Sequence, residues 1–478
     1  MSETSLKTLV ILMGGSLVLG LLLLARPSYL ASSQVLGTFI VAQVIFAAVC
    51  KYRQSFFLTL VAAFLWAGTD LPFRGAWLQG RWFVLGIGAL AGLAIYMKDH
   101  NHHFTAFHLV AFSCVLSALV SALVSAYPEE ALLKALSLLL LFVYGAAGAR
   151  LAIPTLRPEK FFRGILLGCE VLTYFTAISY FLFRWEVFGS PNSLGAVMGV
   201  AVVPIMLWGL LISQTVAERR RRGLGLLLAM LVLVSSFSRA GIAAAAIPCL
   251  FLCTALRQYR LIAKGVSMAI ILAVIATVFL PQPEEAPKWN GSESIISMFL
   301  YKGKPQEGLM GSRKGPWDQT WSVIRNHPWF GSGFGTSLTG EDLTQAGVSF
   351  SGSHVDSRVI REHGNSYLAI TEWTGLLGVV PFSFLITFIV LNIGKVFSRI
   401  RRTGDVFSPA VPVAAILAAG LVDAAFEDWL FAIGYYLCVF FWALAFILVD
   451  VLREPAVVYS SEAVAIPHLQ FVATASGQ

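Results

Sequence analysis

The sequence is dominated by apolar stretches that are long enough to cross a lipid bilayer. A spanning helix needs about 20 predominantly apolar residues, and the chain holds roughly fourteen such stretches joined mostly by short connections. Some are short or closely joined, and half-helices or re-entrant pieces among them would lower the number of crossings to about twelve. We therefore predict an all-α polytopic integral membrane protein with about 12 to 14 transmembrane helices. The expected spans are 8–25, 33–50, 55–69, 81–97, 104–126, 131–149, 162–183, 193–214, 223–238, 240–256, 263–280, 366–394, 408–424 and 427–449.

Composition supports a membrane protein and excludes the large soluble enzyme classes. Hydrophobic residues make up 57% of the 478 residues and charged residues only 13%, whereas soluble domains carry about 25% charged residues. Almost no length is left for a Rossmann or P-loop domain. The net charge of +8 does not indicate nucleic acid, because a basic excess in a membrane protein normally reports loop topology.

The positions of the cations predict the orientation in the membrane. If the N-terminus is cytoplasmic, the connections and tail on that side carry 20 Lys and Arg residues. This asymmetry follows the positive-inside rule and predicts that both termini face the cytoplasm. The run 219–222 is expected to anchor this topology beside anionic lipid headgroups. The opposite short loops hold only six cations, Arg26, Arg74, Arg81, Lys134, Arg184 and Arg239.

The chain divides into two sets of spans around one long outer connection. We expect N-terminal transmembrane helices in 1–280, a large outer loop in 281–365, C-terminal transmembrane helices in 366–455 and a cytoplasmic tail in 456–478. The loop carries nine acidic and eight basic residues, so it is nearly neutral and is no polyanion-binding patch. A connection of this length is usually functional. A short helix is expected inside it, with Pro316 in the first turn and one apolar face formed by Trp317, Trp321 and Ile324.

Searches for metal and cofactor motifs in the sequence are negative. The six cysteines lie in or at the edges of apolar spans and are typical of small buried hydrophobes. His100, His102 and His103 cluster in a loop, where a solvated loop is favoured over a metal site. The chain has no Asp-x-Asp pair and no phosphate-binding loop motif, and we expect neither a metal nor a cofactor.

Arginines on the outer side oppose the topology rule, so each one needs a reason. Arg239 begins a span, where free backbone N–H groups already favour an anion, and its small neighbours Ala240 and Gly241 are expected to let a bulky headgroup approach. Arg184 lies in another short outer turn, and Arg313 precedes the loop helix. These three are candidates for binding a phosphate group, although Arg239 could also simply extend toward the membrane surface.

A polar cluster is expected where the outer loop returns to the membrane. His363 precedes Asn365 and Ser366, either of which is suited to cap the following helix. An imidazole at this place can accept a proton near neutral pH, but it could also be an ordinary loop histidine. Glu372 lies about two turns into the helix, where a carboxylate must face protein or water. The acid that orients His363 is left open among Glu362, Glu372, Asp423, Glu427 and Asp428.

These motifs resemble the O-antigen ligase and polymerase superfamily of bacterial envelope glycosyltransferases, and the single large loop is similar to that of WaaL-type ligases. Members commonly have His directly followed by Asn, whereas Gly364 intervenes here. The resemblance covers roughly 190–450. It is carried by Ser238-Arg239-Ala240-Gly241, by 313–335 with Trp321, His327-Pro328 and Gly331-Ser332-Gly333, and by 363–368 followed by Glu372 and Gly375.

The resemblance implies a GT-C-like fold and a metal-independent, inverting glycosyl transfer. The donor would be O-antigen on undecaprenyl diphosphate and the acceptor lipid A-core oligosaccharide, at the periplasmic face of a Gram-negative inner membrane, among membrane lipids. Arg239 and Arg313, with Arg184 a further candidate, would bind the donor diphosphate, and His363 would act as the base at the acceptor. Asn365, Glu372, Asp423, Glu427 and Asp428 would support or orient these groups. A polymerase of the same superfamily is the alternative, and a lipid-linked glycan transporter is a more distant one.

Overall fold

The computed structural model of the chain describes residues 56–71, 74–98, 104–149, 158–279, 311–337 and 363–453. Within these ranges every regular element is a helix. Five described helical segments are long and apolar enough to cross a membrane: Ala106–Leu123, Pro128–Gly148, Phe161–Phe183, Pro191–Leu211 and Ser366–Thr403. The expected all-helical membrane architecture is therefore confirmed in its general form. The expected spans 8–25 and 33–50, the expected tail 456–478 and the cluster around His102 lie outside the described residues.

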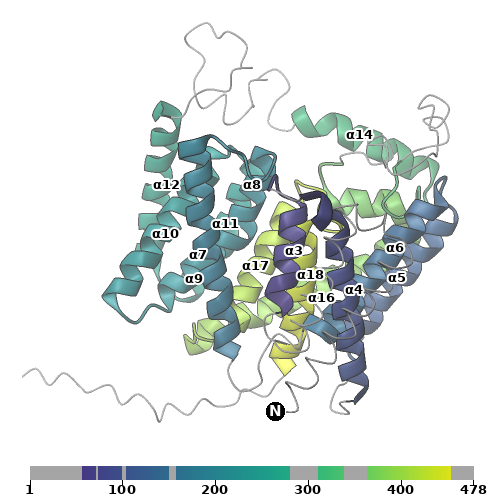
Figure 1. Cartoon of the computed structure of the whole chain (residues 1–478), viewed down its shortest axis with the longest axis horizontal. Coiled ribbons are helices and arrows are strands. Elements are labelled where there is room, and N and C mark those ends of the chain that lie inside the picture. The colour runs from purple at the N-terminus through teal and green to yellow at the C-terminus, as the bar shows by residue number, and fades with distance from the viewer. Residues whose placement is uncertain are drawn as a thin grey trace, which may run out of the picture.

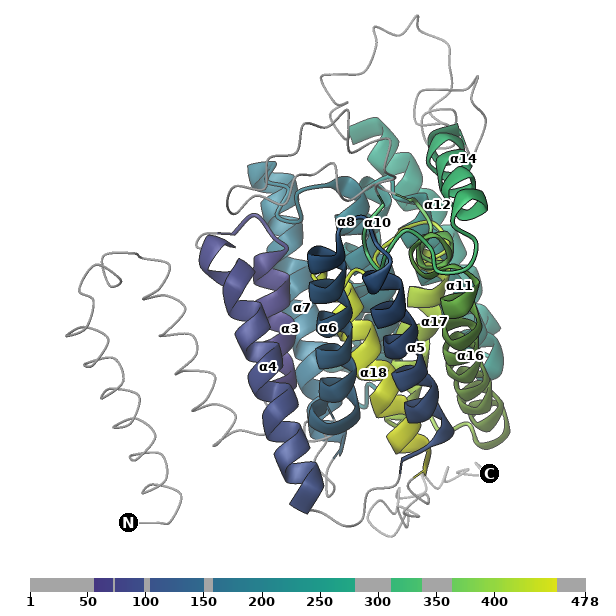
Figure 2. The same ribbon diagram turned by 90° about the vertical axis from the view of Figure 1, so that its right-hand side faces the viewer.

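The long helices run side by side and form a bundle, and the short helix α14 lies beyond one end of it (Figures 1 and 2). We call this end the α14 end. In chain order the elements are α3 (Phe56–Ala67), α4 (Arg74–Lys98), α5 (Ala106–Leu123), α6 (Pro128–Val143), η3 (Tyr144–Gly148), α7 (Pro158–Phe183), α8 (Pro191–Val197), η5 (Met198–Val202), α9 (Val203–Leu211), α10 (Val216–Ser235), α11 (Arg239–Ala255), α12 (Tyr259–Phe279), α14 (Gly311–Asn326), α16 (Ser366–Thr403), α17 (Ala410–Asp423) and α18 (Tyr436–Arg453).

The last span is shorter than its hydropathy predicts. We expect a helix from 427, but α18 begins at Tyr436, and 427–435 forms turns and irregular backbone. Trp429, Leu430 and Phe431 in this segment are buried like helix residues. Hydropathy indicates that a segment has apolar surroundings but does not determine its backbone conformation. The prediction of a helix over 427–435 is therefore wrong.

Small residues near the start of α11 bring it into close contact with the segment that contains α8 and η5. A Cβ atom added to Gly241 would collide with the backbone of Gly195, and one added to Gly199 would collide with Gly241. Ala240 is buried as well. We expected these residues to admit a lipid headgroup, but the structure uses their small size for helix packing, as membrane helices commonly do.

The helix α16 is broken at Gly375, which has φ 58° and ψ −162°. The freed backbone groups bond to the segment that follows α14: Leu376 donates its N–H to the Pro328 carbonyl at 2.8 Å, and Ser332 donates to the Glu372 carbonyl at 2.9 Å. Trp373 O also accepts from the N–H of Gly333. A break at membrane depth is tolerated only where other protein groups satisfy the freed backbone, and the loop 327–337 does so here.

The loop helix differs from its expected register. It begins at Gly311, so Pro316 lies inside α14 rather than in its first turn. The buried positions are Thr320 and Val323, whereas Trp321 is 49% exposed. Of the expected face, Trp317 and Ile324 are half-buried beside Thr320 and Val323, and only Trp321 points away from the protein. The spacing of three apolar residues along the sequence could not show which side of the helix packs against the rest of the protein.

The arginine run 219–222 is not uniform. Arg219, Arg220 and Arg221 are exposed, but Arg222 is buried. The Arg222 guanidinium donates to the Gly209 carbonyl at 2.7 Å and to the Ser213 hydroxyl at 3.2 Å, and it lies 4.0 Å from the Glu170 carboxylate of α7. The last arginine of the run thus joins α7, α9 and α10 and does not face lipid headgroups as expected.

Candidate active site

His363 lies just before α16 and is enclosed on every side, with no exposed surface. Its Nδ1 lies 3.4 Å from Asp428 Oδ2, and its backbone N–H donates to the same oxygen at 2.8 Å. Its Nε2 lies 3.0 Å from the Ser337 hydroxyl and 3.2 Å from Glu372 Oε1. The indole of Trp373 packs edge-on against the ring, with 5.4 Å between the ring centroids. The imidazole therefore has an acidic partner at each nitrogen.

This surrounding favours the protonated imidazole. Burial by itself lowers the pKa of His363, but the hydrogen bonds and charges of Asp428 and Glu372 outweigh it, and the net effect raises the pKa above its ordinary 6.5. Burial likewise acts to raise the pKa of Asp428, yet its hydrogen bonds with His363 hold that pKa below the usual 3.8. The pair can thus hold a proton on the ring between two carboxylates, and the neutral ring is a correspondingly stronger base.

The helix start of α16 holds His363 in place. Asn365 is the N-cap, because its side-chain oxygen accepts from the N–H groups of Tyr367 at 2.8 Å and Leu368 at 3.1 Å. Its amide also donates to the Ala425 carbonyl at 2.9 Å. Ser366 donates its hydroxyl to the Glu427 carbonyl at 2.7 Å. The contacts of Asn365 are those of a cap that ties α16 to the turn after α17.

Arg313 of α14 lies beside the histidine loop. Its guanidinium donates to Glu427 Oε1 at 2.6 Å, and both side chains are only 15% exposed. A Cβ atom added to Gly364, which has φ 63°, would lie 2.6 Å from the Arg313 Nη1. The glycine between His363 and Asn365 therefore provides the backbone conformation and the room that let an arginine pack next to the histidine.

The four acids of this region that the structure describes divide into three roles. Asp428 and Glu372 contact His363, and Glu427 pairs with Arg313. Asp423 is buried and accepts from the Trp429 indole N–H at 2.7 Å. Its contact with Trp429 fixes the segment 427–435 rather than the ring. Glu362 lies outside the described residues.

The two remaining arginine candidates lie on other helices. Arg239 is the first residue of α11, half-buried, directly after the N-cap Ser238, whose hydroxyl accepts from the Gly241 N–H at 3.2 Å. Arg184 is exposed in the turn between α7 and α8 and has φ 50°. The structure thus places Arg313 against Gly364, the residue after His363. Arg239 lies at the start of α11, and Arg184 lies just after the end of α7.

A comparison with known families covers the part of the chain where these groups lie. Residues 224–383 match the family model described as O-antigen ligase. This segment of the chain is therefore similar to the O-antigen ligase family. The match includes Arg239, Arg313, His363 and Glu372 and ends before Asp428, and it confirms the resemblance to the O-antigen ligase superfamily. No curated protein sequence shows significant similarity to the chain.

Two further cations support the loops that build the candidate site. Lys134 of α6 donates to the Gly335 carbonyl at 2.5 Å, and Arg81 of α4 donates to the Gly434 carbonyl at 2.6 Å. The sequence placed both on the outer side but assigned them no role. Cations on the outer side are unusual, and this was the sequence signal that both residues have a function. The carbonyl groups to which they donate could be identified only from the structure of the two loops.

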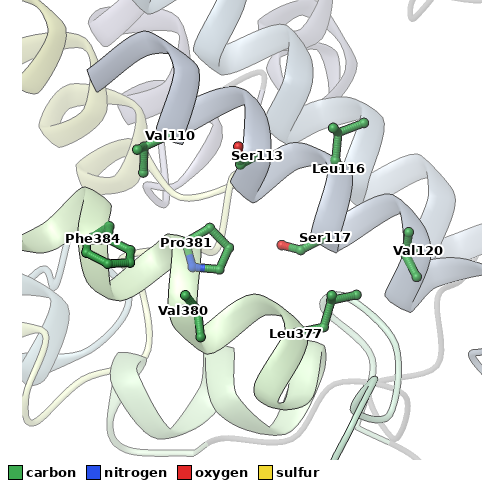
Figure 3. Close-up of a pocket in the computed structure, with 9 residues that line it drawn as sticks. All are labelled: Val110, Ser113, Leu116, Ser117, Val120, Leu377, Val380, Pro381 and Phe384. Atoms are coloured by element: carbon green, nitrogen blue, oxygen red, sulfur yellow. The ribbon is translucent and has the colours of Figure 1, made fainter. Parts of the chain in front are cut away.

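A lateral groove of about 370 Å³ lies between α5 and α16, next to the Gly375 break (Figure 3). Apolar side chains from the two helices point toward one another across it. Ser121, the residue after the lining Val120, donates its hydroxyl to the Trp373 carbonyl. The Trp373 indole in turn contacts His363. The groove lining is Val110, Ser113, Leu116, Ser117, Val120, Leu377, Val380, Pro381 and Phe384.

Proposed function

We propose that the protein is an O-antigen ligase, which transfers a polysaccharide from undecaprenyl diphosphate to a sugar hydroxyl of lipid A-core. The reaction would take place at the periplasmic face of the inner membrane of a Gram-negative bacterium. The observation that carries the proposal is the buried histidine between Asp428 and Glu372, with Arg313 packed against its loop, inside a family-matched segment. An apolar groove beside the same histidine suits a protein whose substrates are lipid-linked.

In this proposal arginines bind the donor diphosphate. Guanidinium groups match phosphate oxygens in pairs and remain charged at any working pH. Arg239 at a helix start and Arg313 beside His363 are the main candidates, and Arg184 is the third. Negative charge grows on the diphosphate as the glycosidic bond breaks, so prepositioned cations stabilise the transition state more than the ground state. Glu427 would hold the Arg313 guanidinium in place and exchange its contact for the diphosphate when the donor binds.

His363 is proposed as the base for the acceptor. The acceptor oxygen attacks the anomeric carbon from the face opposite the diphosphate, which inverts the configuration, and its proton ends on the imidazole. The resulting imidazolium lies between the carboxylates of Asp428 and Glu372. A positioned base typically contributes about 10²- to 10⁴-fold to the rate.

The test is a reconstituted transfer assay with purified undecaprenyl diphosphate-linked O-antigen and lipid A-core. We expect His363→Ala and His363→Asn to lose transfer by at least about 10²-fold while a labelled donor still binds. Arg239→Lys should raise the donor KM, because an ammonium lacks the paired geometry, and Arg220→Lys at an exposed position is the matched control. Undiminished ligation by both His363 variants would overturn the base assignment.

The same assay separates the alternatives. A polymerase of the superfamily would join lipid-linked O-antigen units to each other and ignore lipid A-core, so each acceptor is supplied alone. A transporter would move the donor across a vesicle membrane without forming a covalent product. Product on lipid A-core with no product on lipid-linked units is the result expected of a ligase.

A further inference from the structure

The burial of His363 creates a problem for direct proton transfer from an acceptor. A general base must come within hydrogen-bond reach of the proton that it takes, directly or through one intermediary. His363 has no exposed surface, and its nitrogens face Asp428, Glu372 and Ser337. A sugar hydroxyl would have to displace one of these buried groups before it could touch the ring.

Ser337 is also buried but keeps 4% of its surface exposed, whereas His363 keeps none, and its hydroxyl has the chemistry of an intermediary. It is the uncharged partner of the ring nitrogen Nε2, with its oxygen 3.0 Å away. The Trp373 indole N–H donates to the same oxygen at 3.3 Å. A serine hydroxyl has one proton and two lone pairs. When the ring is neutral at Nε2, the serine proton points to Nε2, the indole uses one lone pair, and the second lone pair is left for an incoming hydroxyl.

The residues just before Ser337 are held by hydrogen bonds from several elements. Lys134 donates to the Gly335 carbonyl at 2.5 Å, and the hydroxyls of Ser125 and Thr336 lie 3.0 Å apart. Ser332 donates its hydroxyl to the Thr336 carbonyl at 2.8 Å. Contacts from the turn after α5, from α6 and from the loop itself therefore fix the residues immediately before Ser337. A group that must transfer a proton along a defined line requires such fixing.

We propose that Ser337 is a catalytic proton relay between the acceptor hydroxyl and His363, which deepens the proposed function and rests on it. The acceptor O–H gives its proton to the Ser337 oxygen as the serine proton passes to Nε2. The acceptor oxygen forms its bond to the anomeric carbon, and the bond from that carbon to the diphosphate breaks with its electron pair leaving on phosphate. Ser337 ends unchanged, and the proton resides on His363.

Glu372 completes the relay rather than replacing it. Its Oε1 lies 3.2 Å from Nε2, so the carboxylate stabilises the positive charge of the imidazolium once Nε2 has taken the proton. Asp428 holds the other nitrogen, and the Arg313 guanidinium on the histidine loop is matched by Glu427. The charged groups around the ring thus stabilise the proton at the end of the relay.

The test compares serine variants in single-turnover transfer with donor and lipid A-core. We expect Ser337→Ala to slow transfer by about 10²-fold, the lower limit for proton transfer by a positioned group, and Ser337→Thr, which keeps the hydroxyl, to retain most of the rate. Trp373→Phe removes the other bond to the serine oxygen but keeps the relay, so it should slow transfer far less than Ser337→Ala.

A proton inventory in mixtures of H₂O and D₂O reports the relay without relying on a folded variant. Two protons that move together give a curved dependence of the wild-type rate on deuterium fraction, whereas one proton gives a straight line. A straight line, or a Ser337→Ala variant with the wild-type rate while His363→Ala is inactive, would overturn the relay alone. Normal transfer by His363→Ala would instead overturn the base assignment on which the relay rests.

Discussion

Asp428 contacts both the backbone and the ring of His363, and the two contacts have different effects. One carboxylate oxygen accepts the backbone N–H of His363 at 2.8 Å and lies 3.4 Å from Nδ1 of its ring. The backbone bond fixes the position of the loop, while the ring contact favours a proton on Nδ1. That tautomer leaves the lone pair of Nε2 directed at Ser337 and Glu372. In the proposed mechanism, this single side chain sets both the position of the base and the ring nitrogen that reacts.

Replacing Asp428 with Asn tests this role through the pH dependence of transfer. The proposed mechanism requires neutral His363, so we expect kcat/KM to rise as pH increases through the His363 pKa, which the two carboxylates raise above 6.5. Removing the Asp428 charge leaves only Glu372 to oppose burial, and the acidic limb of the pH profile should move to lower pH. Because the imidazolium is also less stabilised, we expect kcat to fall by about tenfold or more. Glu427→Gln, which alters the Arg313 pair instead, should leave the acidic limb in place, and an unshifted limb in Asp428→Asn would contradict the assignment.

At the scale of elements, the candidate site depends on the break in α16. Backbone groups at the break form hydrogen bonds with the loop 327–337 in place of bonds within the helix. The segment after α14 accepts from Leu376 and Leu377 and donates to the carbonyls of Glu372 and Trp373. The same segment carries Ser337 to His363. The break in α16 therefore aligns Glu372 and Ser337 on the same ring nitrogen, and the loop and the helix define the site together.

Gly375→Ala should separate the loop from the helix. Gly375 has φ 58° and ψ −162°, a backbone conformation that only glycine adopts without strain. Any other residue there costs about 1–3 kcal/mol. An added Cβ would also lie 2.5 Å from the backbone of Trp329. We expect lower thermal stability and loss of most transfer, measured by a melting curve and by the ligation assay. Gly394→Ala in the same helix, where a Cβ meets open space, should change neither, and equal behaviour of the two variants would show that the break is not required.

The sequence allowed the elements of the site to be predicted better than their arrangement. The Asn365 cap and the start of α16 at Ser366 follow from residue types and are confirmed. The irregular backbone of 427–435 was missed, because its apolar residues have the hydropathy of a span. The choice between Asp428 and the other acids could not be made either, since it depends on which carboxylate the turn after α17 directs inward. Ser337 carried no signal, because a serine in a long loop becomes distinctive only beside a histidine.

Across the whole molecule, charged side chains tie helices together at both ends of the bundle. At the α14 end, Arg81 and Lys134 donate to carbonyls of the two loops that form the site. At the start of α10, remote from Arg239, Arg222 bonds to the end of α9 and approaches Glu170. A carboxylate within an apolar span must have partners in the protein, and Arg221, 3.4 Å away, is the second partner of Glu170. We infer that this cluster supports the fold, whereas the groups at the α14 end support the reaction.

This separation predicts that stability and activity respond independently to changes at the start of α10. Arg222→Met removes the Gly209 and Ser213 bonds and leaves the buried Glu170 with one largely exposed partner, a change that costs about 3 kcal/mol when one member of a buried pair is lost. The melting temperature should fall clearly, while transfer at low temperature stays within about twofold of wild type, since a change this far from the reacting groups leaves the transition-state contacts intact. The double variant with Glu170→Gln should recover part of the loss, because no uncompensated charge then remains buried. Arg220→Met, at an exposed position, is the control for loss of the charge itself. If Arg222→Met melted like wild type, the arginine run would contact lipid headgroups rather than α7 and α9.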